Sequence, residues 1–121
     1  MAWRFRSGAP VTAQIVDRIR VDILSGVYPR GSAFPTVRGL ATDAAVNPNT
    51  MQKALLLLES EGLLVTRGTA GRWVTDSEET LGAARLAVKD KAVGAIIRDA
   101  REAGIGLDEL IEKIKKGWET K

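Results

Sequence analysis

The stretch Asn47-Pro48-Asn49-Thr50-Met51-Gln52-Lys53-Ala54-Leu55 decides the fold. Asn47 is suited to cap a helix, because its side-chain oxygen can accept a hydrogen bond from a free amide of the first turn. Pro48 would then occupy the first helical position, where its missing N–H and fixed φ fit well. Apolar residues recur at helical spacing along the rest of this stretch and predict one buried stripe: Met51, Ala54, Leu55 and Leu58.

The other face of this predicted helix is polar over its first two turns. It carries Asn49, Thr50, Gln52 and Lys53, which are short polar groups and one cation suited to base edges and phosphates. This pattern is typical of a helix that enters the major groove of DNA. The alternative is an ordinary capped amphipathic helix whose polar face is only solvated, so the flanking sequence has to decide.

Composition limits the possible chemistry. The 121 residues include no cysteine and no histidine, which excludes disulfides, thiolate zinc sites and the commonest general base. Acidic residues are interleaved with basic ones, and no phosphate-cradling glycine loop occurs. The longest apolar run, residues 54–58, is too short to span a bilayer, and neither end resembles a signal peptide. We therefore expect a cytoplasmic protein that is not an enzyme and has no metal or cofactor.

The positive charge is unevenly distributed. Residues 1–76 hold nine Lys/Arg and six Asp/Glu, whereas residues 77–121 hold nine of each. Five cations lie in the middle of the first part: Arg30, Arg38, Lys53, Arg67 and Arg72. If the fold gathers them on one face, they would form a phosphate-binding surface.

Two helices are predicted before the deciding stretch. Ile15, Val16, Ile19, Ile23 and Leu24 recur at helical steps after Pro10, with Thr12 as the expected N-cap and Gly26 as the end. Residues 27–32 form a turn. Thr36 is expected to cap the second helix, in whose first turn Arg38 would be either a phosphate or guanine ligand or a plain surface arginine. The short connection 42–46 joins this second helix to the helix that Asn47 caps, and the two together match a helix-turn-helix.

The sequence also predicts an N-terminal arm before the first helix and a wing after the deciding stretch. Trp3 and Phe5 would pack on the first helix or on a partner subunit, with a minor-groove role for Arg4 and Arg6 as the alternative. After Gly62, residues 63–66 and 72–75 read as two strands joined by a glycine-containing turn, 67–71. A helix-turn-helix followed by such a hairpin is a winged helix.

This pattern resembles the DNA-binding domain of the GntR family of bacterial transcription regulators. The residues that carry the resemblance are Gln14-Ile15, Gly26, Pro29, Gly31, Phe34-Pro35-Thr36, Arg38, Leu40-Ala41, Thr50, Ala54, Leu58-Glu59, Gly62-Leu63 and Gly71. Val46 to Thr50, the Trp3 arm and the short C-terminal part resemble the YtrA-like subfamily. The resemblance implies DNA contacts by Thr36, Arg38, the segment 47–52 and the wing.

The sequence also departs from the family pattern. Pro48, Asn49 and Gln52 stand where many members carry an arginine. Because Asn and Gln pair naturally with adenine, we expect Asn49 and Gln52 to read adenine. Family wings usually have two glycines two residues apart, whereas Gly68 and Gly71 are three apart, and Arg72 replaces a small polar residue.

The C-terminal part predicts two further helices. Asp76 and Glu79 resemble a capping box, and an apolar stripe runs from Leu81 to Ala100, with Gly104 ending the helix. A second stripe, from Leu107 to Trp118, follows. We expect these helices to form a homodimer seam through Leu81, Val88, Ala95, Ile96, Ile111 and Ile114. The alternative is that both pack on the winged helix of their own chain.

The sequence thus predicts a mainly α fold with a small β-hairpin. Residues 1–76 would be a winged helix-turn-helix domain, and residues 77–121 a two-helix dimerisation module. The predicted function is a homodimeric repressor that binds a palindromic operator in double-stranded DNA. The predicted DNA contacts are Thr36, Arg38, Asn47, Asn49, Thr50, Gln52, Lys53, Arg67, Gly68 and Arg72. The alternative is a winged helix that docks proteins without reading DNA. The sequence does not identify a small-molecule effector.

Overall fold

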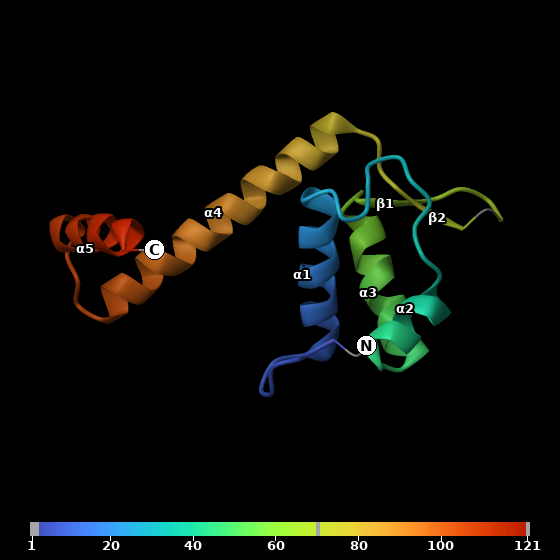
Figure 1. Cartoon of the computed structure of the whole chain (residues 1–121), viewed down its shortest axis with the longest axis horizontal. Helices are drawn as coiled ribbons and strands as arrows, with labels where there is room; N and C mark the ends of the chain where they lie inside the picture. The colour runs from blue at the N-terminus through green and yellow to red at the C-terminus, as the bar shows by residue number, and fades with distance from the viewer. Residues whose placement is uncertain (1–2, 70, 121) are drawn as a thin grey trace. The chain divides into compact units, whose positions relative to one another are not determined.

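Along the described part of the chain, three helices are followed by a β-hairpin and then by two further helices (Figure 1). The structure is a computed structural model that describes residues 3–69 and 71–120. The elements are α1 (Val11–Leu24), α2 (Val37–Ala44), α3 (Pro48–Ser60), β1 (Leu64–Thr66), β2 (Arg72–Val74), α4 (Glu78–Glu102) and α5 (Leu107–Glu119). They form two compact units, Met1–Ala84 and Arg85–Lys121, which are described separately below. The predicted mainly α fold with a small hairpin is confirmed.

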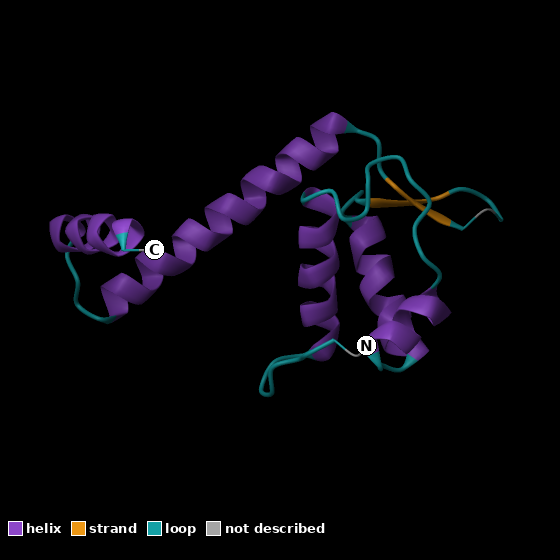
Figure 2. Cartoon of the chain, viewed as in Figure 1, coloured by secondary structure: helices purple, strands orange, loops and turns teal. Residues whose placement is uncertain are grey.

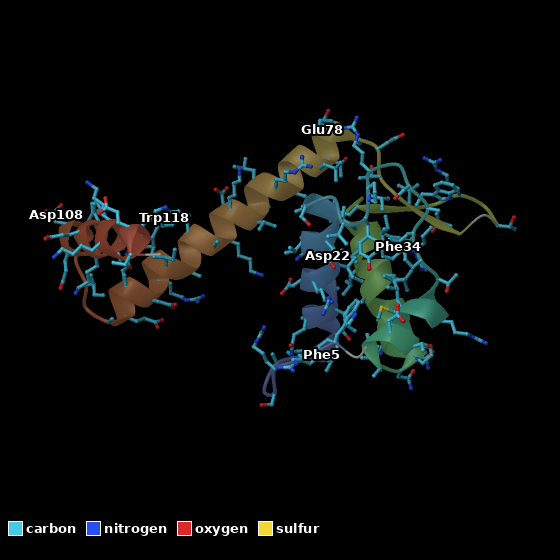
Figure 3. All side chains as sticks on the ribbon, in the orientation of Figure 1. Phe5, Asp22, Phe34, Glu78, Asp108 and Trp118 are labelled. Atoms are coloured by element: carbon cyan, nitrogen blue, oxygen red, sulfur yellow. The ribbon has the colours of Figure 1, made fainter. Side chains whose placement is uncertain are left out.

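The first unit is built around α3. Helix α1 lies beside α3, and α2 packs against its N-terminal half (Figure 1). The predicted stripe of α3 is fully buried: Met51, Ala54, Leu55 and Leu58. Phe34, labelled in Figure 3, joins this core and packs against Tyr28, with the two rings tilted by 58° and 4.8 Å between their centroids.

Local capping explains where α2 and α3 begin and where α3 ends. Thr36 Oγ1 accepts from the amide of Gly39 at 3.0 Å, and Asn47 Oδ1 accepts from the amide of Asn49 at 2.8 Å. Both caps were predicted. Gly62, at φ 82°, ends α3 with its amide bonded to the Glu59 carbonyl, while Leu63 bonds to Leu58. These two bonds form a Schellman motif, which satisfies carbonyls that the helix end would otherwise leave unpaired.

The hairpin strands are each one residue shorter than predicted, and a third segment pairs with one of them. Strands β1 and β2, orange in Figure 2, pair antiparallel with Thr66 opposite Arg72. The segment 32–34 before α2 also pairs with β2, although the sequence predicted only a turn at 27–32. The Phe34 amide donates to the Arg72 carbonyl, and the Val74 amide donates to the Ser32 carbonyl. The backbone of Arg72 is therefore held on both sides, which ties the hairpin to the entrance of α2.

The start of α1 corrects one prediction. Thr12 was expected to cap this helix, but α1 begins at Val11 after Pro10, and no side chain caps it. Gln14 instead binds the N-terminal arm: its Oε1 accepts from the Arg6 amide, and its Nε2 donates to the carbonyls of Arg6 and Ala9. The arm packs on the first unit as predicted, with Trp3 lying 4.1 Å below the Arg18 guanidinium.

The start of α4 corrects two more predictions. Ser77, not Asp76, caps the helix, because its hydroxyl accepts from the Thr80 amide at 3.1 Å. Leu81 was assigned to the dimer seam, yet only 1% of it is exposed and it belongs to the core of the first unit. The first turns of α4 therefore pack with the winged helix, and the first compact unit extends beyond the predicted boundary at residue 76.

The second unit consists of the rest of α4 and all of α5. Helix α4 ends at Glu102, and Gly104 follows at φ 77°, as predicted. Apolar side chains remain exposed on both helices: Val93, Ile96, Ile97, Leu107, Ile111, Ile114 and Trp118. Helix α5 has no buried residue at all, and Trp118, labelled in Figure 3, is 81% exposed.

Candidate nucleic-acid interface

The N-terminal half of α3 presents the predicted polar face. Asn49 and Lys53 are exposed, while Thr50 and Gln52 are half-buried. Asn47 contributes mainly as the helix cap, because its oxygen is already bonded to the Asn49 amide. The side chains that remain available to a ligand at this helix start are therefore those of Asn49 and Lys53, with the outer edge of Gln52.

The start of α2 supplies a second group. Thr36 and Arg38 are both exposed. The Thr36 hydroxyl is engaged as the N-cap, whereas the Arg38 guanidinium makes no ion pair within residues 3–69 and 71–120. Arg38 lies in a helical first turn, where the free amides already favour an anion. This arginine has the freedom that a phosphate or guanine ligand needs.

The hairpin carries the third group at its tip. Arg67 is exposed and lies 5.2 Å from the centre of the Trp73 ring, a cation–π arrangement that steadies the guanidinium while leaving it accessible. Gly68, at φ 54°, adopts a left-handed backbone conformation that is unfavourable for residues with a side chain. A groove of about 350 Å³ runs between this hairpin and the start of α2, lined by Phe34, Pro35, Thr36, Val37, Thr66, Gly71 and Arg72.

Arg72 is placed differently from the other cations. Its Nε donates to Glu59 Oε1 at 2.5 Å, and its Nη2 donates to Gln52 Oε1 at 3.4 Å. The Thr66 hydroxyl donates to the other Glu59 oxygen at 2.8 Å. The carboxylate thus holds both members of the cross-strand pair Thr66–Arg72 against α3. Only 16% of the Arg72 side chain and 24% of Glu59 are exposed.

The charge state of Glu59 follows from these contacts. Burial alone would raise the pKa of the Glu59 carboxyl, but the hydrogen bonds from Arg72 and Thr66 and the charge of Arg72 outweigh it. The net effect is a pKa below the usual value. Glu59 is therefore ionised at neutral pH and neutralises Arg72.

The five cations do not form one uniform surface. Arg30 pairs with Glu78 and Arg72 with Glu59. Arg38, Lys53 and Arg67 are exposed and make no ion pair in the described part of the chain. They come from α2, α3 and the hairpin, which are the three elements that a winged helix presents to DNA.

The sequence did not predict the ion pairs that Glu59 and Glu61 form. Glu61 binds Arg20 of α1 through two hydrogen bonds of 2.9 and 2.6 Å, which raise the pKa of Arg20 despite its partial burial. The signal for Glu59 was its position seven residues after Gln52, which places both on one face of α3. Only the register of the hairpin shows that Arg72 reaches that face.

Comparison with known proteins agrees with this geometry. Residues 11–74 match the model of the bacterial regulatory proteins of the gntR family. This chain belongs to the GntR family. It is 34% identical over 112 residues to the HTH-type transcriptional repressor YtrA of Bacillus subtilis, covering 92% of this chain and 86% of that protein. The resemblance to YtrA-like members that the sequence indicated is thus confirmed.

Similar solved structures include a GntR-family regulator and a protein–operator complex. A GntR family transcriptional regulator from Listeria monocytogenes superposes with a TM-score of 0.86 at 28% identity, covering 93% of this chain and 98% of that one. The DNA-binding domain of AraR, solved in complex with operator ORX1, matches 60% of this chain and 93% of its own length, with a TM-score of 0.55 at 27% identity.

Membership of the GntR family establishes a DNA-binding transcription regulator rather than an enzyme. The described residues contain no group of acidic side chains arranged to hold a metal ion. Among them, no helix has the length and apolar character required to cross a membrane.

Proposed function

We propose that this GntR-family protein is a homodimeric repressor that binds a palindromic operator in the bacterial cytoplasm. The observation that carries the proposal is the exposed apolar face of the second unit. Ile96 is 47% exposed on α4, and Ile111 and Ile114 are each 41% exposed on α5. Apolar surface of this kind is unusual on a monomer and favours a protein partner.

A second copy of the chain is the partner that fits best. A regulator that reads a two-fold symmetric site needs a two-fold interface, in which the same surface of each subunit meets its equivalent. The proposed seam consists of Val88, Ala95, Ile96, Ile111 and Ile114. Leu81 is not part of it, because it is buried in its own subunit. The function thus divides between a DNA-binding part within residues 1–76 and a dimerisation part within residues 77–121.

The proposed DNA contacts follow the exposure of each side chain. Arg38, Lys53 and Arg67 bind phosphate or guanine, and Asn49 and Gln52 read bases from the start of α3. Thr50 lies beside them on α3, and Gly68 allows the wing tip to approach the DNA backbone. Thr36 and Asn47 act by capping, which aims the amides of two helix ends toward DNA. The similarity to YtrA supports repression as the outcome of binding.

Selection of binding sites from random duplex DNA by the full chain tests this proposal. We expect the selected sites to contain two inverted half-sites about one helical turn, or roughly 10 base pairs, apart. A selected motif without an inverted repeat would contradict a two-fold operator. Binding without any sequence preference would contradict specific readout.

A further inference from the structure

Arg72 differs from the cations proposed to bind phosphate, because it is enclosed by its own protein. Its guanidinium lies between Glu59 and Gln52, and its main-chain carbonyl accepts from the Phe34 amide at 2.9 Å. Only 16% of the Arg72 side chain is exposed, and the Glu59 carboxylate 2.5 Å away neutralises its charge. Arg72 is therefore poorly placed to bind a phosphate. The sequence suggested Arg72 as a DNA ligand, and its surroundings suggest a different role.

The contact between Arg72 and Gln52 biases how the glutamine amide is turned. A guanidinium has only donors, so the atom of Gln52 that faces it must be the carbonyl oxygen. The amide nitrogen of Gln52, with two N–H donors, then lies on the side away from Arg72. It has no hydrogen-bond partner within residues 3–69 and 71–120. At 3.4 Å the hydrogen bond is long, so it biases the amide orientation without contributing much stability.

The orientation of this amide matters for base readout. A glutamine that reads adenine uses both ends of its amide, accepting from N6 and donating to N7. A glutamine whose oxygen faces an arginine turns its two N–H donors to the opposite side, so that a base on that side meets the donors first. Guanine is the base with two acceptors, O6 and N7, on its major-groove edge, whereas cytosine presents a donor there.

We infer that Arg72 is a positioning residue that turns the Gln52 amide so that its nitrogen reads guanine instead of adenine. This inference rests on the proposed function, since it assumes that the start of α3 lies in the major groove. It replaces the expectation of an adenine contact at Gln52 and leaves Asn49, whose side chain is exposed, as the candidate adenine reader. Glu59 supports the arrangement by fixing the Arg72 guanidinium from the other side.

Site selection with wild type, Gln52→Ala, Arg72→Met and Arg67→Met tests the inference. We expect the wild-type half-site to contain one guanine whose preference disappears in Gln52→Ala. In Arg72→Met the same position should accept adenine, with the guanine-over-adenine ratio falling by roughly 5- to 100-fold. Arg67→Met is the matched control, and we expect it to weaken binding to all sites while keeping the preference at that position.

The salt dependence of binding separates positioning from phosphate contact. Loss of one phosphate ligand lowers the slope of log affinity against log salt by about 1. We expect that loss in Arg67→Met and an unchanged slope in Arg72→Met. The inference is overturned if Arg72→Met lowers the slope and keeps the wild-type preference, or if the position that depends on Gln52 selects adenine in the wild type. If the wild type selects no motif, the proposed function fails together with the inference.

A second variant tests the contact without DNA. Gln52→Glu replaces the amide by a carboxylate that can form an ion pair with Arg72. Because Glu59 already neutralises Arg72, the test is a comparison: we expect Gln52→Glu to be better tolerated, in melting temperature, when Arg72 is present than in the Arg72→Met background. An equal effect in both backgrounds would show that the two side chains do not interact, which would also overturn the inference.

Discussion

Glu59 and Arg72, thirteen residues apart in the sequence, join the last turn of the recognition helix α3 to the second strand of the wing, with 2.5 Å between Oε1 and Nε. The Thr66 hydroxyl reaches the same carboxylate from the first strand. Because one carboxylate bonds to both strands, we expect the stability of the wing to depend on the charge of Glu59.

Glu59→Gln should destabilise the first unit by about 1–3 kcal/mol at neutral pH, because a charge-assisted hydrogen bond to a partly buried arginine is lost. Urea unfolding of wild type and variant measures the difference. Glu112→Gln, on the exposed helix α5, is the matched control and should leave the unfolding free energy unchanged. An equal effect of the two substitutions would contradict the role of Glu59.

The same pair predicts a pH dependence. The pKa of Glu59 is lowered in the folded protein from its usual value of 4.5, so its stabilising contribution is complete above that value. The contribution is lost as the pH falls through the lower folded pKa, when the carboxylate becomes protonated. The difference in unfolding free energy between wild type and Glu59→Gln should therefore shrink on acidification below pH 4.5. A constant difference across that range would show that the charge of Glu59 is not what stabilises the wing.

Arg38→Ala should weaken operator binding by about 1–3 kcal/mol without lowering the melting temperature, because the side chain is exposed and unpaired within the described residues. Arg98→Ala, on an exposed part of α4, serves as the control and should bind as the wild type does. Fluorescence anisotropy with a selected operator duplex measures both affinities. Unchanged affinity in Arg38→Ala at unchanged stability would reject its contact with DNA.

Asn49→Ala and Lys53→Ala should differ in the kind of binding they lose. Asn49 can pair with both hydrogen-bonding groups of adenine, so its removal should relax selection at one or two adjacent positions. Lys53 offers a point charge, so its removal should weaken all sites alike and reduce the salt slope by about 1. Site selection and a salt titration separate the two effects. If Asn49→Ala keeps the complete wild-type motif, the assignment of Asn49 to base readout is wrong.

Local sequence rules predicted the elements of the interface well. Asn47, Pro48 and Thr36 each fix a helix start through their own backbone or a neighbouring amide, and such signals need no knowledge of the rest of the chain. The cap of α4 was placed on Asp76 instead of Ser77, because two adjacent residues had capping side chains and only the backbone geometry distinguishes them.

The predictions that failed or were missing depend on contacts between distant segments. Leu81 belongs to an apolar helical stripe, yet it is buried in the winged helix, since the direction in which α4 leaves β2 decides its environment. Pairing of Ser32 and Phe34 with β2 has no local signal. The enclosure of Arg72 by Glu59 and Gln52 likewise depends on the register of the hairpin, which the sequence does not determine alone.

Ile96→Asp should disrupt the proposed homodimer, because it places a charge in an apolar seam and should raise the dissociation constant roughly a hundredfold or more. Ala87→Asp is the matched control, since it is exposed and lies nine residues earlier, about half a turn around α4. Binding of Ile96→Asp to a palindrome should fall toward its binding to a half-site, because the second winged helix is no longer tethered. A variant that retains full preference for the palindrome would remove Ile96 from the seam.

Sedimentation equilibrium of the wild-type chain at micromolar concentration tests the central claim most directly. The account predicts a mass twice the 13.0 kDa of one chain, reduced toward a single chain by Ile96→Asp and retained by Ala87→Asp. A wild-type protein that sediments at 13.0 kDa would contradict the homodimer and the two-fold operator together.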